Sequence, residues 1–335
     1  AASIAGSRRV PIFAATLGIL TALDLFAGNS DYVAGRSYAY LRIPNPLTEF
    51  IARHRGEGRF KMLPPDHPLL NNIRMSHVQA SGCDLFDPVS VSRMPTDYTA
   101  LFDAVKANPM RLWELGAIRY FITLPGGAQQ LEQTDGNRGR VREVLAAGLA
   151  QAGGGVLPVS DAPASQQVLR IAEFSVARPK FSFAVHTRTT PETPDGERDA
   201  LARMISADFD PAAEAVVHGD PAPAASPESH IQRIVRDDPA LAAVEVETPA
   251  AALLTRAVKY DPDWRVRIDG SGAALRRVNS LFQGVVVPPG QHRIEFEYRP
   301  DRTPLAIAVA GRIGWIGLGL VWGIRRRPQT VPPVE

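Results

Sequence analysis

The two longest apolar runs of the chain lie near its two ends. Residues 10–28 include one charge, Asp24, and residues 304–324 form a second run that includes only Arg312. About 20 apolar residues in a helix are enough to cross a hydrocarbon core of about 30 Å. We therefore predict two transmembrane helices. For the first and less strictly apolar run, a buried helix of a soluble domain is the alternative.

Basic residues flank both runs on the sides that face the chain ends. A pair of arginines precedes the first run, and three consecutive arginines follow the second. Membrane-flanking segments rich in Lys and Arg stay in the cytoplasm. We therefore predict cytoplasmic tails at 1–9 and 325–335, and we place residues 29–303 on the extracytoplasmic side.

Each predicted membrane helix carries one charged residue. A charge at the centre of such a helix costs about 2.5–3.5 kcal/mol on insertion scales, so Arg312 requires a partner. We predict an intramembrane ion pair with Asp24. The alternatives are that the arginine side chain extends to the interface, or that its partner lies in helices before residue 1. The chain begins without methionine, so we expect it to be the C-terminal portion of a longer protein.

Between the two runs, helical and strand-like patterns alternate up to residue 217. Apolar positions at helical spacing predict helices at 46–54, 96–106, 109–115, 139–151 and 197–205. Short β-branched and aromatic runs predict strands at 60–63, 117–124, 156–159, 167–171 and 181–185. This alternation predicts a mixed α/β domain over residues 29–217.

The pattern changes beyond a stretch at 218–240 that is rich in Pro, Ala, Ser and Asp, which predicts an exposed linker. Apolar residues then recur at every second position in short segments separated by turn residues. This predicts an antiparallel β-sandwich module at 241–303. The predicted fold class is thus α+β, with the α/β domain and the sandwich flanked by two transmembrane helices.

Composition argues against several functions. The net charge is only +2 and the basic residues are scattered, which does not favour a nucleic-acid partner. The seven histidines are dispersed and the chain has one cysteine, so we expect no metal site and no cofactor. His77 and Asp84 lie near Cys83 in sequence, but we favour a structural thiol over a nucleophile. Without a nucleophile elbow or a phosphate loop, we identify no catalytic residue.

Three segments of the predicted β module resemble a known family. They read Tyr-Asp-Pro-Asp-Trp-Arg-Val-Arg-Ile-Asp-Gly at 260–270, Asn-Ser-Leu-Phe-Gln-Gly-Val at 279–285 and Pro-Pro-Gly-Gln-His-Arg-Ile-Glu-Phe-Glu-Tyr-Arg-Pro at 288–300. In order and spacing they resemble the C-terminal domain of YfhO-type bacterial membrane proteins, a family that is similar to the glycosyltransferase C superfamily. One position departs from the pattern: Asp263 stands where the family usually has glycine.

The resemblance implies a bacterial inner-membrane protein that transfers sugars from polyprenyl-phosphate carriers, with a catalytic loop that lies outside this chain. We therefore expect the C-terminal portion of an enzyme that modifies envelope glycans or glycolipids. Its expected partners are the lipid bilayer, a lipid-linked sugar or glycan acceptor, and further transmembrane helices. The alternative is a membrane-anchored binding or scaffolding module without catalysis, with carbohydrate as one candidate ligand.

Four residues of the module are candidates for carbohydrate binding. Trp264 and Tyr260 could stack on the apolar face of a sugar, and Asp269 and Arg265 could supply polar contacts. Trp264 has the same parity as the apolar positions of its strand, however, so we favour burial of its ring in the core. We expect His292 to form a structural hydrogen bond at a turn.

Overall fold

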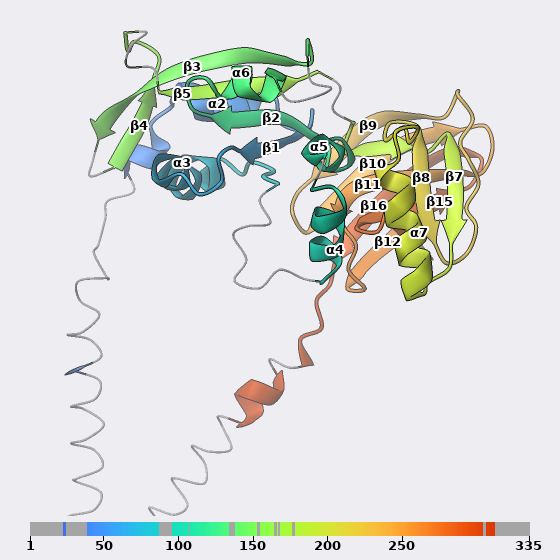
Figure 1. Ribbon diagram of the computed structural model, residues 1–335. Helices are drawn as coiled ribbons and strands as arrows, with labels where there is room; N and C mark the ends of the chain where they lie inside the picture. The colour runs from blue at the N-terminus through green and yellow to red at the C-terminus, as the bar shows by residue number, and fades with distance from the viewer. Residues whose placement is uncertain are drawn as a thin grey trace, which may run out of the picture. The chain divides into compact units, whose positions relative to one another are not determined.

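The chain divides into two compact units, Ala1–Ser37 with Asp301–Glu335, and Tyr38–Pro300. A computed structural model of the protein describes residues 23–24, 39–86, 96–106, 108–133, 138–152, 155–163, 166, 168–175, 178–303 and 306–311. The helices and strands labelled in Figure 1 all lie in the second unit.

The predicted fold class is wrong in its two flanking transmembrane helices. None of the helices within the described residues is long and apolar enough to cross a membrane. In the predicted spans, helical conformation is described at 23–24 and 306–311, and six helical residues extend only about 9 Å. The remainder of both spans, including Arg312, lies outside the described residues. The pairing of Arg312 with Asp24 therefore stays a prediction.

A mixed five-stranded sheet forms the N-terminal part of the second unit. Its strand order is β1-β2-β5-β3-β4. β1 and β2 are parallel, and the other neighbouring pairs are antiparallel. The strands are β1 (Arg59–Met62), β2 (Ile118–Thr123), β3 (Val141–Ala152), β4 (Gly155–Val159) and β5 (Leu169–Phe174).

The helices begin at residues suited to helix starts. Asn45 precedes α2 and its side chain accepts a hydrogen bond from the backbone of Thr48, while Thr193 caps α7 in the same way. Proline opens four of them, where its missing N–H costs nothing. The helices of the second unit are η1 (Ala39–Arg42), α2 (Pro46–Arg53), α3 (Pro68–Ile73), η2 (Arg74–Val78), α4 (Thr96–Ala104), α5 (Pro109–Leu115), α6 (Gly127–Gln133) and α7 (Pro194–Ile205).

The segment 139–151, predicted to be a helix, is a strand instead. β3 pairs with β5 on one side and with β4 on the other. Its residues are largely Ala, Leu and Val, and the Ala and Leu content favours a helix by intrinsic propensity. Pairing along both edges outweighs this preference, because strand propensity depends strongly on the sheet context.

The C-terminal part of the second unit is a sandwich of two sheets. One has the order β13-β12-β16-β10-β9 and the other β6-β11-β15-β14-β8-β7; all pairs are antiparallel except β7 with β8. The strands are β6 (Phe181–Phe183), β7 (His186–Thr190), β8 (Glu214–His218), β9 (His230–Asp237), β10 (Leu241–Thr248), β11 (Ala252–Lys259), β12 (Trp264–Ile268), β13 (Ser271–Ala273), β14 (Arg276–Val278), β15 (Phe282–Val287) and β16 (Gly290–Tyr298).

Residues from both sheets fill the sandwich core, among them Val244, Leu254, Val285 and Phe296, all buried. The sandwich also includes β6 to β8 from the predicted α/β domain and β9 from the predicted linker. Helix α7 packs on β7 and β8 (Figure 1). A second buried cluster joins α4, α5 and β2 to α7, β8 and β15, so the mixed sheet and the sandwich share part of their core.

Candidate ligand-binding site

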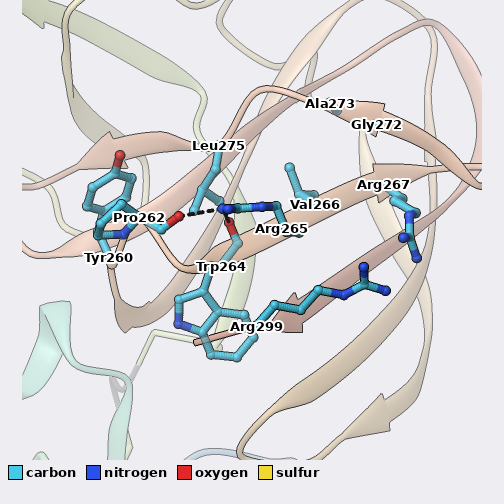
Figure 2. Close-up of a pocket in the computed structure, with 10 residues that line it drawn as sticks. All are labelled: Tyr260, Pro262, Trp264, Arg265, Val266, Arg267, Gly272, Ala273, Leu275 and Arg299. Carbon is cyan, nitrogen blue, oxygen red and sulfur yellow. Dashed lines mark hydrogen bonds between the residues drawn. The ribbon is translucent and has the colours of Figure 1, made fainter. Parts of the chain in front are cut away.

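Strand β12 is only partly covered along one edge. It pairs with β16 from Trp264 to Ile268, but with β13 only from Val266 onward. In the described part of the chain, the start of β12 therefore has a strand on one side only. A pocket of about 530 Å³ lies here, lined by Tyr260, Pro262, Trp264, Arg265, Val266, Arg267, Gly272, Ala273, Leu275 and Arg299 (Figure 2).

Three arginines give this pocket a basic lining. The exposed Arg265 donates hydrogen bonds from its guanidinium to the carbonyl oxygens of Pro262 and Trp264, which hold its side chain across the start of β12 (Figure 2). Arg299 and Arg267 both pair with the carboxylate of Glu297, at 2.7 and 3.5 Å. Three guanidinium groups with one carboxylate between them leave hydrogen-bond donors for a polar ligand.

The ring of Trp264 belongs to the core of the sandwich. Its residue is 7% exposed, its ring centroid is 4.5 Å from the Arg256 guanidinium carbon, and Tyr298 lies 5.3 Å from it, ring to ring. The burial predicted from its parity is therefore confirmed. The half-buried Tyr260 is the more accessible aromatic side chain of the pocket.

Behind Trp264, a buried cation lies among aromatic rings. Arg256 is 1% exposed, and its guanidinium lies over the rings of Trp264, Phe296 and Phe181 at 4.5, 5.0 and 5.6 Å. Its Nη1 donates to the side-chain oxygen of Gln283 at 3.1 Å. Burial lowers the pKa of Arg256 to about 10, so the residue stays cationic at neutral pH.

Asp269, the fourth candidate, is absent from the lining of the pocket. Its backbone has a φ of 50° in a turn, and its carboxylate accepts from Arg293 N at 2.8 Å and lies 2.6 Å from His292 Nδ1. The Arg293 N–H, followed by His292, lowers the pKa of Asp269, and the bond to Asp269 raises that of His292. The structural hydrogen bond predicted for His292 is confirmed.

Sequence reasoning missed a second pocket, of about 320 Å³, with a buried ion cluster in its wall. The amino group of Lys180, 8% exposed, contacts Asp84 and lies 2.7 Å from Asp237. Arg59 pairs with Asp84 at 3.1 Å. Burial alone would raise the pKa of Asp84, but the charges of Arg59 and Lys180 outweigh it and lower the pKa to about 2.

Cys83 lines the same pocket without the features of a nucleophile. Burial, reinforced by the charge of Asp84, raises the pKa of its thiol to about 12, so it is protonated at neutral pH. His77 Nε2 lies 2.6 Å from the carbonyl oxygen of Val156. These observations fit a structural thiol. The described residues contain no cluster of three or more His, Cys, Asp or Glu side chains arranged to hold a metal.

Comparison with known proteins bears on the segment that contains the β12 pocket. Residues 239–310 match the family described as bacterial membrane protein YfhO. The predicted resemblance is thereby confirmed over about a fifth of the chain, from β10 through β16 and beyond. The YfhO match indicates association with a bacterial membrane. No curated protein and no solved structure matches the chain significantly.

Proposed function

We propose that this chain is the glycan-binding portion of a bacterial envelope protein and that its β12 pocket holds a polar carbohydrate group. The observation that carries the proposal is the arginine-rich pocket itself, whose lining residues all lie within the YfhO-matched segment. The match supports a membrane setting, and the lining supports recognition of a ligand rich in hydrogen-bond acceptors.

The pocket has the size and chemistry that a sugar requires. Its volume of about 530 Å³ lies within the range of small-molecule sites, roughly 300–1,000 Å³. Arg265 and Arg299 donate to hydroxyl, carboxylate or phosphate oxygens, and the ring of Tyr260 packs against the apolar face of the sugar. Trp264 forms the floor, and Asp269 fixes the turn that follows β12.

In this proposal the bound group is the acceptor or the lipid-linked sugar of a glycosyl transfer on the extracytoplasmic face of the inner membrane. The resemblance to the glycosyltransferase C superfamily supports this part, with the reacting residues outside this chain. In the alternative role, the chain binds glycans in the same pocket but no sugar is transferred. The two roles can be distinguished by incubating the bound glycan with membranes that contain the parent protein. Only in the first role does the glycan gain or lose a sugar.

The test is binding of the full chain, kept in mild detergent, to an array of bacterial envelope glycans. Arg299→Ala and Tyr260→Ala are each expected to weaken binding to the preferred glycan at least tenfold. Arg233→Ala is the matched control, because Arg233 is also exposed and paired with a glutamate, Glu245, but lies outside the pocket. Equal binding by all four proteins, or no glycan bound by the wild type, would refute the proposal.

A further inference from the structure

A separate cavity of about 470 Å³ lies where the mixed sheet and the sandwich meet. One wall is formed by α5, another by the segment between α7 and β8, and the remainder by residues that precede β3 and β6. The lining consists of Asn108, Met110, Arg111, Glu114, Arg140, Arg178, Ala207, Asp208, Phe209, Asp210, Pro211 and Ala212. Three of these residues are arginines, and each comes from a different part of the chain.

Arg178 is buried at this cavity without a counter-ion in contact. It is 5% exposed. Its Nε donates to the hydroxyl of Ser182 at 2.7 Å, and its Nη2 donates to the hydroxyl of Thr255. Among the described residues, these two hydroxyl groups are its hydrogen-bond acceptors and no carboxylate lies in ion-pair contact with it. Burial lowers its pKa to about 10, with only a partial offset from the charge of Asp210.

A buried cation without a charged partner is costly, because it loses its hydration and gains little Coulomb energy in return. The nearby hydroxyl groups satisfy two of the guanidinium nitrogens but supply no negative charge. Arg256, which is buried more deeply still, has three aromatic rings around it, whereas Arg178 borders open space. This arrangement fits a site that is completed by an anion.

Arg111 adds a second buried guanidinium to the lining. Its Nη1 donates to Phe209 O at 3.0 Å and to Glu114 at 3.2 Å, and its Nη2 donates to Ser206 O at 3.2 Å. Its Nε is buried and has no hydrogen-bond partner. A buried donor left unpaired is destabilising, so the protein groups around Arg111 do not satisfy all the donors of its guanidinium.

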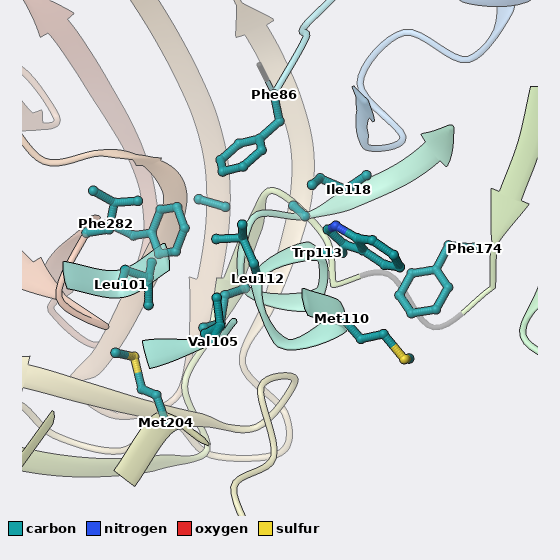
Figure 3. Packing of buried hydrophobic residues seen from close by; sticks show 14 of the residues in the cluster. Phe86, Leu101, Val105, Met110, Leu112, Trp113, Ile118, Phe174, Met204 and Phe282 are labelled. Carbon is teal, nitrogen blue, oxygen red and sulfur yellow. The ribbon is translucent and has the colours of Figure 1, made fainter. Parts of the chain in front are cut away.

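Helix α5 holds Arg111 firmly in place. Met110, Leu112 and Trp113 on the same helix pack into the buried cluster that joins the two parts of the unit (Figure 3). Because the neighbours of Arg111 are fixed in this core, its side chain needs little reorganisation on binding, which favours affinity. Arg140 is different: it is 42% exposed on its side chain and lies 3.6 Å from Glu114, so it stands at the accessible side.

Two of the three carboxylates of the lining form ion pairs with arginines other than Arg178. Glu114 is shared between Arg111 and Arg140. Asp208 pairs with Arg203 at 2.7 Å, outside the lining. Asp210 is exposed and accepts a hydrogen bond from the backbone of Ala212 at 2.9 Å. Of the three lining arginines, Arg178 is thus the one without a carboxylate partner in the described structure.

We propose that this cavity is a binding site for a small oxyanion-bearing molecule, whose carboxylate or phosphate group contacts Arg178 and Arg111. Guanidinium groups recognise both anions through short, charge-assisted hydrogen bonds. The volume is large enough for a ligand of sugar or amino-acid size, larger than the anion alone. The site is separate from the β12 pocket and shares no lining residue with it.

The test is isothermal titration of the full chain with inorganic phosphate and, separately, with acetate. Saturable binding of at least one of them to the wild type is expected, and the tighter one identifies the preferred oxyanion. Arg178→Gln is expected to weaken that binding at least tenfold. Arg236→Gln, at an exposed arginine paired with Asp238 and outside this cavity, is expected to leave it unchanged.

Arg178 is buried, so Arg140→Gln provides an independent measurement if Arg178→Gln fails to fold. Because Arg140 lies on the accessible side, this variant is expected to fold normally and to weaken anion binding several-fold. The proposal is overturned if neither anion binds the wild type saturably. It is equally overturned if every variant that folds, including Arg140→Gln, binds the anion as tightly as the wild type.

Discussion

Lys180 and Arg256 are both buried cations, but the two regions around them satisfy the charge in opposite ways. Lys180 lies against two carboxylates, Asp84 and Asp237. Arg256 lies among three aromatic rings and donates to one neutral amide, that of Gln283. In the first region, loss of the cation leaves Asp237 without its ion-pair partner, while Asp84 keeps Arg59. In the second, no carboxylate of the described residues contacts the cation and those of Asp237 and Asp84 act on it only from a distance, so substitutions should affect the two regions very differently.

The largest effect is expected from Lys180→Met. The substitution keeps most of the side-chain volume but leaves Asp84 and Asp237 without the ammonium group between them. Breaking a buried ion pair from one side costs about 3–5 kcal/mol. The free energy of unfolding, measured for the full chain in urea, should fall by about that amount.

Two further variants show whether this loss comes from Asp237, the carboxylate that Lys180→Met leaves without an ion-pair partner. Lys106→Met removes an exposed lysine and should change stability by less than about 0.5 kcal/mol. Adding Asp237→Asn to Lys180→Met should recover part of the loss, because it removes one stranded charge. If the double variant is no more stable than the single one, the ion cluster is not the cause.

Trp264→Leu is expected to have the next largest effect, on the aromatic side of the comparison. The ring of Trp264 lies 4.5 Å from the Arg256 guanidinium, and a desolvated cation–π contact contributes about 2 kcal/mol. Lost packing adds to this, so we expect a loss of about 2–3 kcal/mol in the free energy of unfolding. Combining Trp264→Leu with Arg256→Met should cost less than the sum of the two single changes. Strict additivity would contradict a stabilising contact between the two residues.

Low pH should destabilise the fold at the Lys180 ion cluster, because Asp84 becomes protonated there. Its pKa is about 2 in the folded protein against an ordinary 3.8. A carboxyl group whose pKa is lower in the folded than in the unfolded protein stabilises the fold at pH values above its unfolded-state pKa. This stabilisation is lost as the pH falls from about 4 through about 2. The contribution is at most about 2.5 kcal/mol. Unfolding free energies measured between pH 5 and pH 2 should therefore fall more steeply for the wild type than for Asp84→Asn, and parallel curves would rule out this role.

The spacing of apolar residues and the residues at helix starts were sufficient to predict those elements whose conformation depends mainly on their own sequence. The helices α2 and α5 begin at proline and carry apolar residues at helical spacing, so their limits could be predicted from the sequence. Burial of Trp264 followed from its parity with Val266. β3 could not be predicted, because the strands on both sides of it decide its conformation.

The ion cluster and the oxyanion cavity lay beyond sequence reasoning for a different reason. Lys180 is 96 residues from Asp84 and 57 from Asp237, and Arg178 meets Thr255 across 77 residues. No spacing rule connects positions so far apart. The pairing of β6 with β11 brings Arg178 to Thr255, and the contact of Lys180 with Asp84 joins the sandwich to the mixed-sheet part. The Tyr260–Arg265 part of the candidate site was accessible because the two residues are close in sequence, Tyr260 in the connection that precedes β12 and Arg265 within β12.

The smallest effect is expected from Arg256→Met, the counterpart of the lysine substitution. Methionine fills a similar volume and its sulfur makes favourable contacts with aromatic rings, while the cost of burying a charge disappears. Against this, the Gln283 side-chain oxygen loses its donor, although its amide nitrogen still donates to Lys259 O at 2.8 Å. We expect these terms nearly to cancel, leaving a change within about 1 kcal/mol. Arg256→Ala, which opens a cavity, should cost more. If Arg256→Met is as destabilising as Lys180→Met, aromatic rings compensate a buried cation as strongly as carboxylates do in this fold.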